Sequence, residues 1–156
     1  MKKKKQQGFT IIEVVLVLAI AGLIFLVVFL AVPALQRSQR DTARRNDVGR
    51  VIAAVQSYRT NSKGTLPATA DWNGAAFKGA YLTPAGEKFE DPQTGNVYTL
   101  NPNPANNASV PPASTMMVHV GRVCADNTDA TATNAGGRNV AIRISLEGGG
   151  VYCASN

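Results

Sequence analysis

The sequence has very few of the side chains that build catalytic and metal sites. It contains one histidine, His119, and two cysteines, Cys124 and Cys153, which lack the close spacing of zinc ligands. A phosphate-binding glycine loop, a nucleophile elbow and a paired-carboxylate site are also absent. Glu90 and Asp91 are adjacent, but they lie in a turn-forming stretch, and we interpret them as turn and strand-edge residues. We therefore predict a protein that is not an enzyme and has no metal site, with His119 in a structural or surface role.

Formal charge is absent from residues 14 to 35, which are rich in Val, Leu, Ile and Phe. A helix needs about twenty apolar residues to cross a bilayer core, so we predict a transmembrane helix over residues 9 to 35. One acid, Glu13, stands near its start, where an unpaired charge facing lipid costs roughly 3 kcal/mol. Glu13 therefore needs a partner, unless its side chain reaches the membrane surface. The alternative is a secretory signal cut after Ala34 to release a binding protein, although this run is longer than a usual signal core.

Most of the excess positive charge lies at the N-terminus. The formal net charge is +6, and four of the sixteen basic residues are the lysines at positions 2 to 5. Lysines ahead of an apolar run favour a cytoplasmic N-terminus, whereas the arginines that follow the run weaken this preference. Those arginines, between residues 37 and 50, could also indicate a DNA-binding module, but no base-reading motif accompanies them. We predict a single-pass protein of the cytoplasmic membrane, and nucleic acid is not an expected partner.

An amphipathic pattern follows the apolar run. Three valines and an isoleucine recur at i, i+3, i+4 and i+7, which is typical of a helix with one buried face. These residues are Val48, Val51, Ile52 and Val55. We expect the helix to continue through an amphipathic part at residues 36 to 62 and to stop near Gly64. We also expect it to bend at Gly22 and Pro33, because a proline inside a helix removes a hydrogen bond.

Charged residues lie beside this apolar stripe. Acids and arginines stand three or four residues apart, which we interpret as i,i+3 and i,i+4 ion pairs on a solvent-exposed face. The groups concerned are Asp41 with Arg44 and Arg45, and Asp47 with Arg50. Each such pair contributes roughly 0.3 kcal/mol, so these contacts are expected to be weak.

Residues 63 to 156 are predicted to form a globular β-rich head. They are rich in Pro, Gly, Asn, Thr and Ala, and residues 101 to 115 are expected to be a turn-rich loop. Strands are expected at residues 97–100, 116–124, 140–147 and 151–153. Apolar and polar side chains alternate in residues 140 to 147, which predicts a half-buried strand, and the glycines at 148 to 150 turn the chain into the next one. We expect an antiparallel sheet of about four strands packed on the valine stripe.

Aromatic residues are spread through the segment between helix and sheet. They are Trp72, Phe77, Tyr81 and Phe89. We expect them to seal the core of the head, and a surface binding patch is the alternative. Cys124 and Cys153 form an even pair in a chain with an export-type N-terminus, which favours one disulfide formed outside the cytoplasm. Two free buried thiols are the alternative.

The N-terminal residues resemble those of type IV pilins and the related pseudopilins. A lysine-rich leader precedes Gly-Phe-Thr-Ile-Ile-Glu at residues 8 to 13, and the long apolar run then continues into the amphipathic helix. The resemblance implies that a prepilin peptidase removes residues 1 to 8 by cutting between Gly8 and Phe9, and that the new amino group of Phe9 is N-methylated. It also implies that Glu13 pairs with such an amino group as an assembly contact between subunits, because charges stripped of water attract strongly.

The resemblance further implies an α+β type IV pilin fold. A long N-terminal helix, first transmembrane and then amphipathic, would pack on a small antiparallel sheet head that often has a C-terminal disulfide loop. The implied function is a structural subunit of a type IV pilus filament, extracellular after assembly. Its partners would be copies of itself in a helical homopolymer, the prepilin peptidase, the inner-membrane pilus assembly platform and, before assembly, membrane lipid. The alternative is a pseudopilin of a type II secretion or DNA-uptake (competence) apparatus, because residues 91 to 100, DPQTGNVYTL, are similar to a stretch of the major pseudopilins.

Two features depart from the family pattern. Many pilins have a proline at the position of Leu30, whereas this chain has Pro33, three residues later. Some pseudopilins bind calcium in a C-terminal loop, and residues 126 to 134, DNTDATATN, carry oxygen ligands but lack the glycine and the terminal acid of a calcium loop. We therefore expect no cofactor, with calcium in this loop as the alternative.

Overall fold

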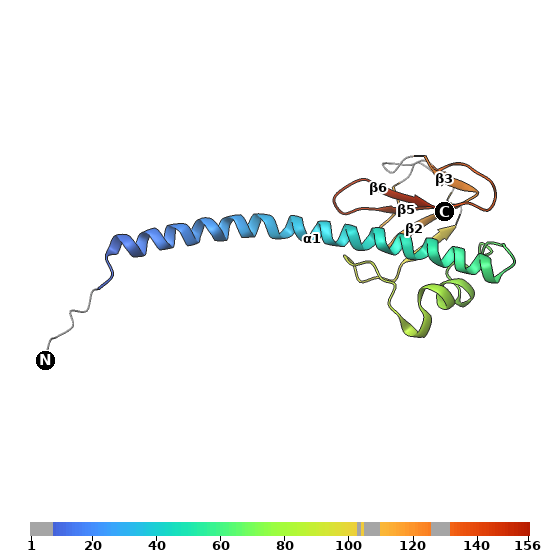
Figure 1. Ribbon diagram of the computed structural model, residues 1–156, viewed down its shortest axis with the longest axis horizontal. Coiled ribbons are helices and arrows are strands. Elements are labelled where there is room, and N and C mark those ends of the chain that lie inside the picture. Colours follow the sequence, from blue (N-terminus) through green and yellow to red (C-terminus); the bar gives the residue numbers. More distant parts are fainter. Residues whose placement is uncertain (1–7, 103, 105–109, 126–131) are drawn as a thin grey trace. The chain divides into compact units, whose positions relative to one another are not determined.

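The structure, a computed structural model, describes residues 8–102, 104, 110–125 and 132–156 (Figure 1). The chain divides into two compact units, Met1–Arg37 and Ser38–Asn156. Helix α1, Ile11–Asn61, extends through both, and Figure 1 colours it from blue to green along its length. The strands follow it in the sequence. The fold is therefore α+β, with one long helix and a small sheet, as the sequence predicts.

Helix α1 is continuous through Gly22 and Pro33, and the bend expected at these residues stays a prediction. The helix ends as the sequence predicts. Lys63 has a φ of 53° and Gly64 a φ of 84°, and the Gly64 N–H donates to the Arg59 carbonyl oxygen at 2.8 Å. This turn satisfies a carbonyl group that the helix end leaves unpaired, and glycine adopts such a φ without steric cost.

The main sheet has four strands in the order β1-β2-β5-β6. They are β1 (Thr99–Pro102), β2 (Thr115–Val120), β5 (Val140–Ser145) and β6 (Val151–Ser155). Strand β5 pairs antiparallel with β2 and β6, but β1 runs parallel to β2, with Thr99 opposite Thr115. The prediction of an all-antiparallel sheet is wrong at β1, and the sheet is mixed. Parallel pairing needs a connection of about a dozen residues or more, and the segment between β1 and β2 is long enough.

The strand predicted over residues 116–124 is broken in two. Gly121, with a φ of 75°, separates β2 from β3 (Arg122–Cys124), which pairs with β4 (Ala132–Asn134) in a second, two-stranded sheet. The Gly121 N–H donates to the Asn139 carbonyl oxygen at 2.7 Å. Residues with a side chain adopt this φ rarely, so the glycine lets the chain leave the main sheet here.

The valine stripe of α1 and one face of the main sheet form the core. Val48, Val51 and Val55 are fully buried, in one cluster with Ile142 and Ile144 of β5. Burying a side chain of this size stabilises the fold by about 1.5–3 kcal/mol relative to leaving it exposed. The prediction that the sheet packs on this stripe is confirmed.

Strand β5 is buried on both faces, so the prediction of a half-buried strand is wrong. On the face away from the valine stripe, Ala141 and Arg143 are 0% and 2% exposed. Ala141 packs with Cys153 of β6, and Cys124 of β3 lies against them. The short second sheet therefore covers a face that the alternating pattern assigned to solvent.

The segment between α1 and β1 contains two short helices that the sequence pattern did not predict. They are the π-helix η1 (Ala75–Leu82) and the 3-10 helix η2 (Pro84–Gly86). Trp72, Phe77 and Phe89 are buried, and Tyr81 packs against the same cluster. The rings of Trp72 and Phe77 meet edge-on, with their centroids 5.0 Å apart. The prediction that these aromatic residues seal the core is confirmed.

Candidate functional site

The large apolar side chains of the N-terminal unit are exposed. Their exposed fractions run from 41% at Val32 to 89% at Phe9. Among the described residues, α1 is the one helix long and apolar enough to cross a membrane, by length and composition. A surface of this extent marks a site of contact with membrane or protein, because water is a poor solvent for it.

The predicted cleavage site lies just before this helix. Gly8 and Phe9 precede α1 and are exposed, and nothing lies within 4 Å of a side-chain carbon placed on Gly8. Exposed backbone outside regular structure is where proteases cut most readily. The cut itself and the methylation of Phe9 stay predictions, and residues 1–7 of the leader lie outside the described residues.

Glu13 is held at the start of the helix by Thr10. Its carboxylate oxygen Oε2 accepts hydrogen bonds from the Thr10 N–H and the Thr10 hydroxyl, both at 2.8 Å. The Glu13 N–H in turn donates to the Thr10 hydroxyl oxygen at 3.4 Å. Thr10 precedes the first helical residue and Glu13 is the third, so the two form a reciprocal cap for N–H groups that a helix start leaves unpaired.

Sequence reasoning missed this role of Thr10. The signal was present, because Thr-x-x-Glu before an apolar run is the pattern of a capping box. The acid at the start of the apolar run thus has a partner within its own chain before any second subunit is considered.

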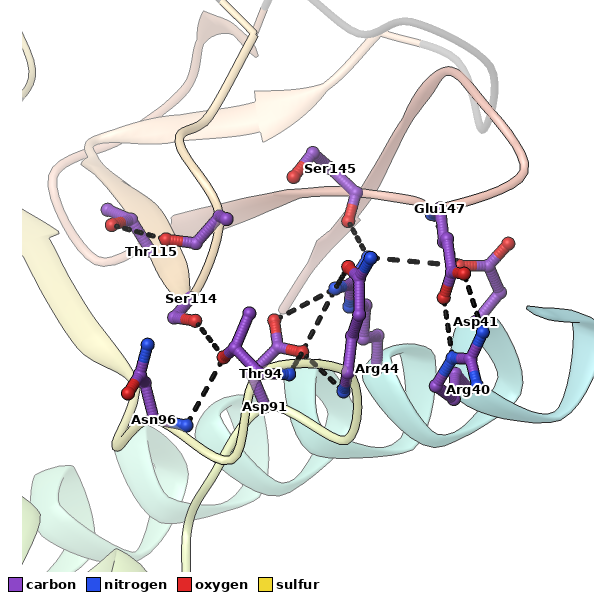
Figure 2. A network of polar contacts seen from close by, with 12 residues as sticks. Arg40, Asp41, Arg44, Asp91, Thr94, Asn96, Ser114, Thr115, Ser145 and Glu147 are labelled. Carbon is purple, nitrogen blue, oxygen red and sulfur yellow. Dashed lines mark hydrogen bonds and ion pairs between the residues drawn. The ribbon is translucent and has the colours of Figure 1, made fainter. Parts of the chain in front are cut away.

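A buried ion pair links α1 to the turn that begins at Asp91 (Figure 2). One terminal nitrogen of Arg44, Nη2, lies 3.0 Å from each carboxylate oxygen of Asp91 and 2.7 Å from Gln93 Oε1. The other, Nη1, donates to the Ser145 carbonyl oxygen at 3.2 Å. The side chains of Arg44 and Asp91 are 3% and 1% exposed. The interpretation of Arg44 as part of a solvent-exposed face is therefore wrong, because the side chain is buried and its closest partners belong to the head.

Asp91 is a turn residue, as predicted, and also the ion-pair partner of Arg44. Its Oδ1 accepts from the Gln93 N–H at 2.8 Å. Burial pushes the pKa of Asp91 upward, but hydrogen bonds from Arg44 and the Gln93 N–H, with the charge of Arg44, hold it below its ordinary value. The carboxylate is therefore charged at neutral pH.

A second polar cluster joins α1 to the turn between β5 and β6 (Figure 2). Arg40 binds Glu147 through two parallel contacts, Nε to Oε2 and Nη2 to Oε1, both at 2.6 Å. Asp41 accepts from the N–H groups of Glu147 and Gly148, at 2.7 and 2.9 Å. A side-chain carbon on Gly148 would come within 3.0 Å of an Asp41 oxygen, so glycine lets this turn approach the helix. Together these contacts attach the turn to the part of α1 that begins the Ser38–Asn156 unit.

Some of the predicted local ion pairs do form. Arg50 lies 3.4 Å from Asp47, whereas Arg44 lies 4.0 Å from Asp41. Arg45 lies over the ring of Tyr152 instead, 5.6 Å from its centroid. Spacing of three residues therefore identified one close pair, but not the contacts to the head.

Cys124 and Cys153 form a disulfide, as predicted. It joins β3 to β6 across 29 positions of sequence, and their Cα atoms are 6.0 Å apart. His119 is a buried residue of β2, and burial, followed by the positive charges of Arg143 and Arg122, lowers its pKa to about 4. A structural role in the head fits its position.

No cluster of three or more His, Cys, Asp or Glu residues that could hold a metal ion occurs among the residues that the structure describes. The calcium alternative concerns residues 126–134, of which 126–131 lie outside the described part of the chain. It therefore stays a prediction, as does the expectation that the protein needs no cofactor.

Comparison with known proteins agrees with the N-terminal pattern. Residues 3–29 match the family model described as the prokaryotic N-terminal methylation motif. The chain is similar to toxin coregulated pilin of Vibrio cholerae serotype O1, with 34% identity over 113 residues, or 69% of this chain. The chain covers 50% of that relative, so it spans about half of its length. No solved structure matches the chain.

Proposed function

Since the methylation motif and the similarity to a pilin identify the chain as a protein of the type IV pilin and pseudopilin family, we propose that it is a structural subunit of a type IV pilus filament. The single observation that carries this proposal is the exposed apolar surface of α1 before residue 38, with one carboxylate at its start. Pilins are structural subunits, and neither the motif nor the relative indicates an enzymatic activity.

The motif and the apolar helix support a membrane-anchored precursor. In the proposal, the N-terminus of the precursor faces the cytoplasm, and membrane lipid covers the apolar surface. A prepilin peptidase cuts between Gly8 and Phe9, and the amino group of Phe9 is methylated. The inner-membrane assembly platform then transfers the subunit into an extracellular helical homopolymer, in which neighbouring helices replace lipid.

Glu13 is the proposed contact that directs this transfer. Both donors of Thr10 bind Oε2, and within the described residues no donor binds Oε1. Cleavage creates a positive amino group at Phe9, and the amino group of one subunit can pair with the Glu13 carboxylate of its neighbour. Because the surroundings are apolar, a pair that forms attracts strongly, whereas an unpaired charge is costly.

The experiment compares fibre formation by Glu13→Ala with that of Glu87→Ala. Glu87 is a matched control, because its side chain is 63% exposed in the head. We expect fibres sheared from cells to fall by tenfold or more for Glu13→Ala and to stay at the normal level for the control. Mass spectrometry of fibre subunits should show chains that begin at methylated Phe9. Normal fibre yield from Glu13→Ala, or subunits that begin at Leu35, would contradict the proposal.

The second candidate is a pseudopilin of a type II secretion or DNA-uptake apparatus. It is favoured by the sequence of residues 91–100, which is similar to a stretch of the major pseudopilins. These residues form the Asp91 turn and the start of β1. A pseudopilin seldom forms abundant surface fibres at natural expression. Few or no sheared fibres, together with loss of secretion or DNA uptake on deletion, would select this candidate.

A further inference from the structure

Strand β1 lies at an edge of the main sheet, because among the described strands β2 is its one neighbour there. The Thr99 N–H donates to the Ser114 carbonyl oxygen at 3.0 Å, so the backbone of Thr99 faces β2. Because backbone groups alternate along a strand, Tyr98, Leu100 and Pro102 face outward, away from β2. A row of unpaired outward groups is a template on which a second chain can add a strand.

Asn73 occupies the outward groups of Leu100. The Leu100 N–H donates to Asn73 Oδ1 at 2.8 Å, and Asn73 Nδ2 donates to the Leu100 carbonyl oxygen at 2.6 Å. A carboxamide has the same donor and acceptor as a peptide group. The Asn73 side chain therefore takes the place that a peptide group of an added strand would occupy.

The outward positions on either side of Leu100, Tyr98 just before β1 and Pro102 at its end, have no free N–H either. The Tyr98 N–H donates to the Phe89 carbonyl oxygen at 3.1 Å, and the Tyr98 carbonyl oxygen accepts from the Lys78 ammonium group. Pro102 has no N–H to offer. Each outward N–H of β1 is therefore already bonded or absent, and the residues that close the edge come from the segment between α1 and β1.

The opposite end strand of the sheet, β6, has contacts of another kind. Strand β6 lies beside β3, to which the Cys124–Cys153 disulfide joins it. The Cys124 N–H also donates to the Ser155 hydroxyl at 3.4 Å. These contacts reach side chains of β6, whereas those at β1 bond directly to outward backbone groups.

We infer that Asn73, together with Lys78, prevents a second copy of this chain from adding a strand at the edge of β1. Heads that share a membrane or a filament are held at high local concentration, and an open edge would let them pair through β1. With this edge closed, pairing through β1 does not compete with association through the apolar surface of α1. The inference goes beyond the proposed function, because it holds equally for a pilus and for a pseudopilus subunit.

Three variants of the full-length chain, purified in detergent micelles, test this inference. Asn73→Ala opens the edge, and we expect roughly tenfold stronger self-association by sedimentation velocity, as one recovered backbone hydrogen bond would supply. A rise in thioflavin T fluorescence should accompany it. Asn46→Ala, at an exposed asparagine of α1, is the control and should behave as the unmodified chain.

Asn73→Asp separates edge protection from simple loss of stability. It removes the same donor as Asn73→Ala but places a negative charge at the edge, and charge there opposes strand pairing. We expect Asn73→Asp to stay unassociated while Asn73→Ala associates, with both folded by circular dichroism. Equal association of the two variants, or no association of a folded Asn73→Ala, overturns the inference.

Hydrogen exchange in the unmodified chain provides a test that needs no variant. If Asn73 closes the edge, the Leu100 N–H should exchange as slowly as N–H groups of β2, within about tenfold. Exchange of the Leu100 N–H at the rate of an exposed loop also overturns the inference, whatever the variants do.

Discussion

The two parts of helix α1 differ in where their partners lie. Up to Arg37 the large side chains are apolar and exposed, and the one carboxylate, Glu13, bonds to Thr10 three residues away. From Ser38 on, valines are buried and arginines bond to residues of the head up to 107 positions away (Figure 2). One continuous helix thus carries one surface for contacts outside the folded unit and another for contacts within it.

The difference shows that charged side chains have different roles in the two parts of the helix. In the N-terminal part a single charge is costly, and a local cap holds it. In the Ser38–Asn156 unit, charges such as Arg44 and Asp91 are buried but paired, so they restrict how the helix and the turns fit together. The substitutions that follow test whether each part responds independently of the other.

The largest expected effect comes from breaking the buried pair. Asp91→Ala leaves the Arg44 charge buried without its partner, which should lower the free energy of unfolding of the head by about 3–5 kcal/mol. Urea unfolding of the full chain in detergent micelles, followed by tryptophan fluorescence, measures it. Lys88→Ala, at a side chain 82% exposed, is the control and should change stability by less than about 0.5 kcal/mol. A loss below about 1 kcal/mol for Asp91→Ala would contradict the assigned role.

The next effect comes from the disulfide. Replacing both Cys124 and Cys153 by alanine should lower the free energy of unfolding by about 3 kcal/mol, because the bond closes a loop of 29 positions. Urea unfolding with and without reductant measures the same quantity on the unmodified chain. Leader removal should be unaffected, since the disulfide lies in the other unit. Equal stability of reduced and oxidised protein would show that the bond does not hold β3 against β6.

Acid should destabilise the head through His119. Its pKa is about 4 in the folded chain and about 6.5 when unfolded, so the unfolded chain binds the proton first as the pH falls. The free energy of unfolding should therefore drop between pH 6.5 and 4, by up to about 3 kcal/mol. His119→Leu should remove most of this dependence when unfolding is compared at pH 7 and 4.5. An unchanged pH slope in the variant would assign the effect to other groups.

Protonation of Asp91 should change the free energy of unfolding in a lower pH range than protonation of His119. Its folded pKa lies below the ordinary value of about 3.9, so its contribution is present above that value and is lost as the pH falls further. The two groups can thus be separated, because the His119 effect is largely complete before protonation of Asp91 begins to matter.

The smallest effect is expected at the helix start. Thr10→Val removes the hydroxyl that caps α1 and binds Glu13, which should cost about 1 kcal/mol of local helix stability. Faster hydrogen exchange of the first N–H groups of α1 in micelles would report it, while urea unfolding of the head stays unchanged. Thr10→Ser keeps the hydroxyl and should behave as the unmodified chain. A loss of head stability in Thr10→Val would mean that the two units are coupled.

Several features were predictable because their signals are local. The apolar run, the valine stripe and the stop at Gly64 depend on periodicity and on residues within a few positions of one another. The cap formed by Thr10 and Glu13 was equally visible as a pattern. The parallel pairing of β1 was not, because strand direction depends on the path of the connection, which alternation of side chains does not encode.

The sequence by itself determined that the protein has a long helix with a membrane-length apolar start, an acid at that start and two cysteines suited to one bond. These features follow from composition and from spacing of a few residues. Only the tertiary structure decided that Arg44 pairs with Asp91, that Asn73 closes the edge of β1 and that β5 is buried on both faces. Such contacts join residues that are distant in the chain, and which of many polar groups meet depends on how the core packs around them.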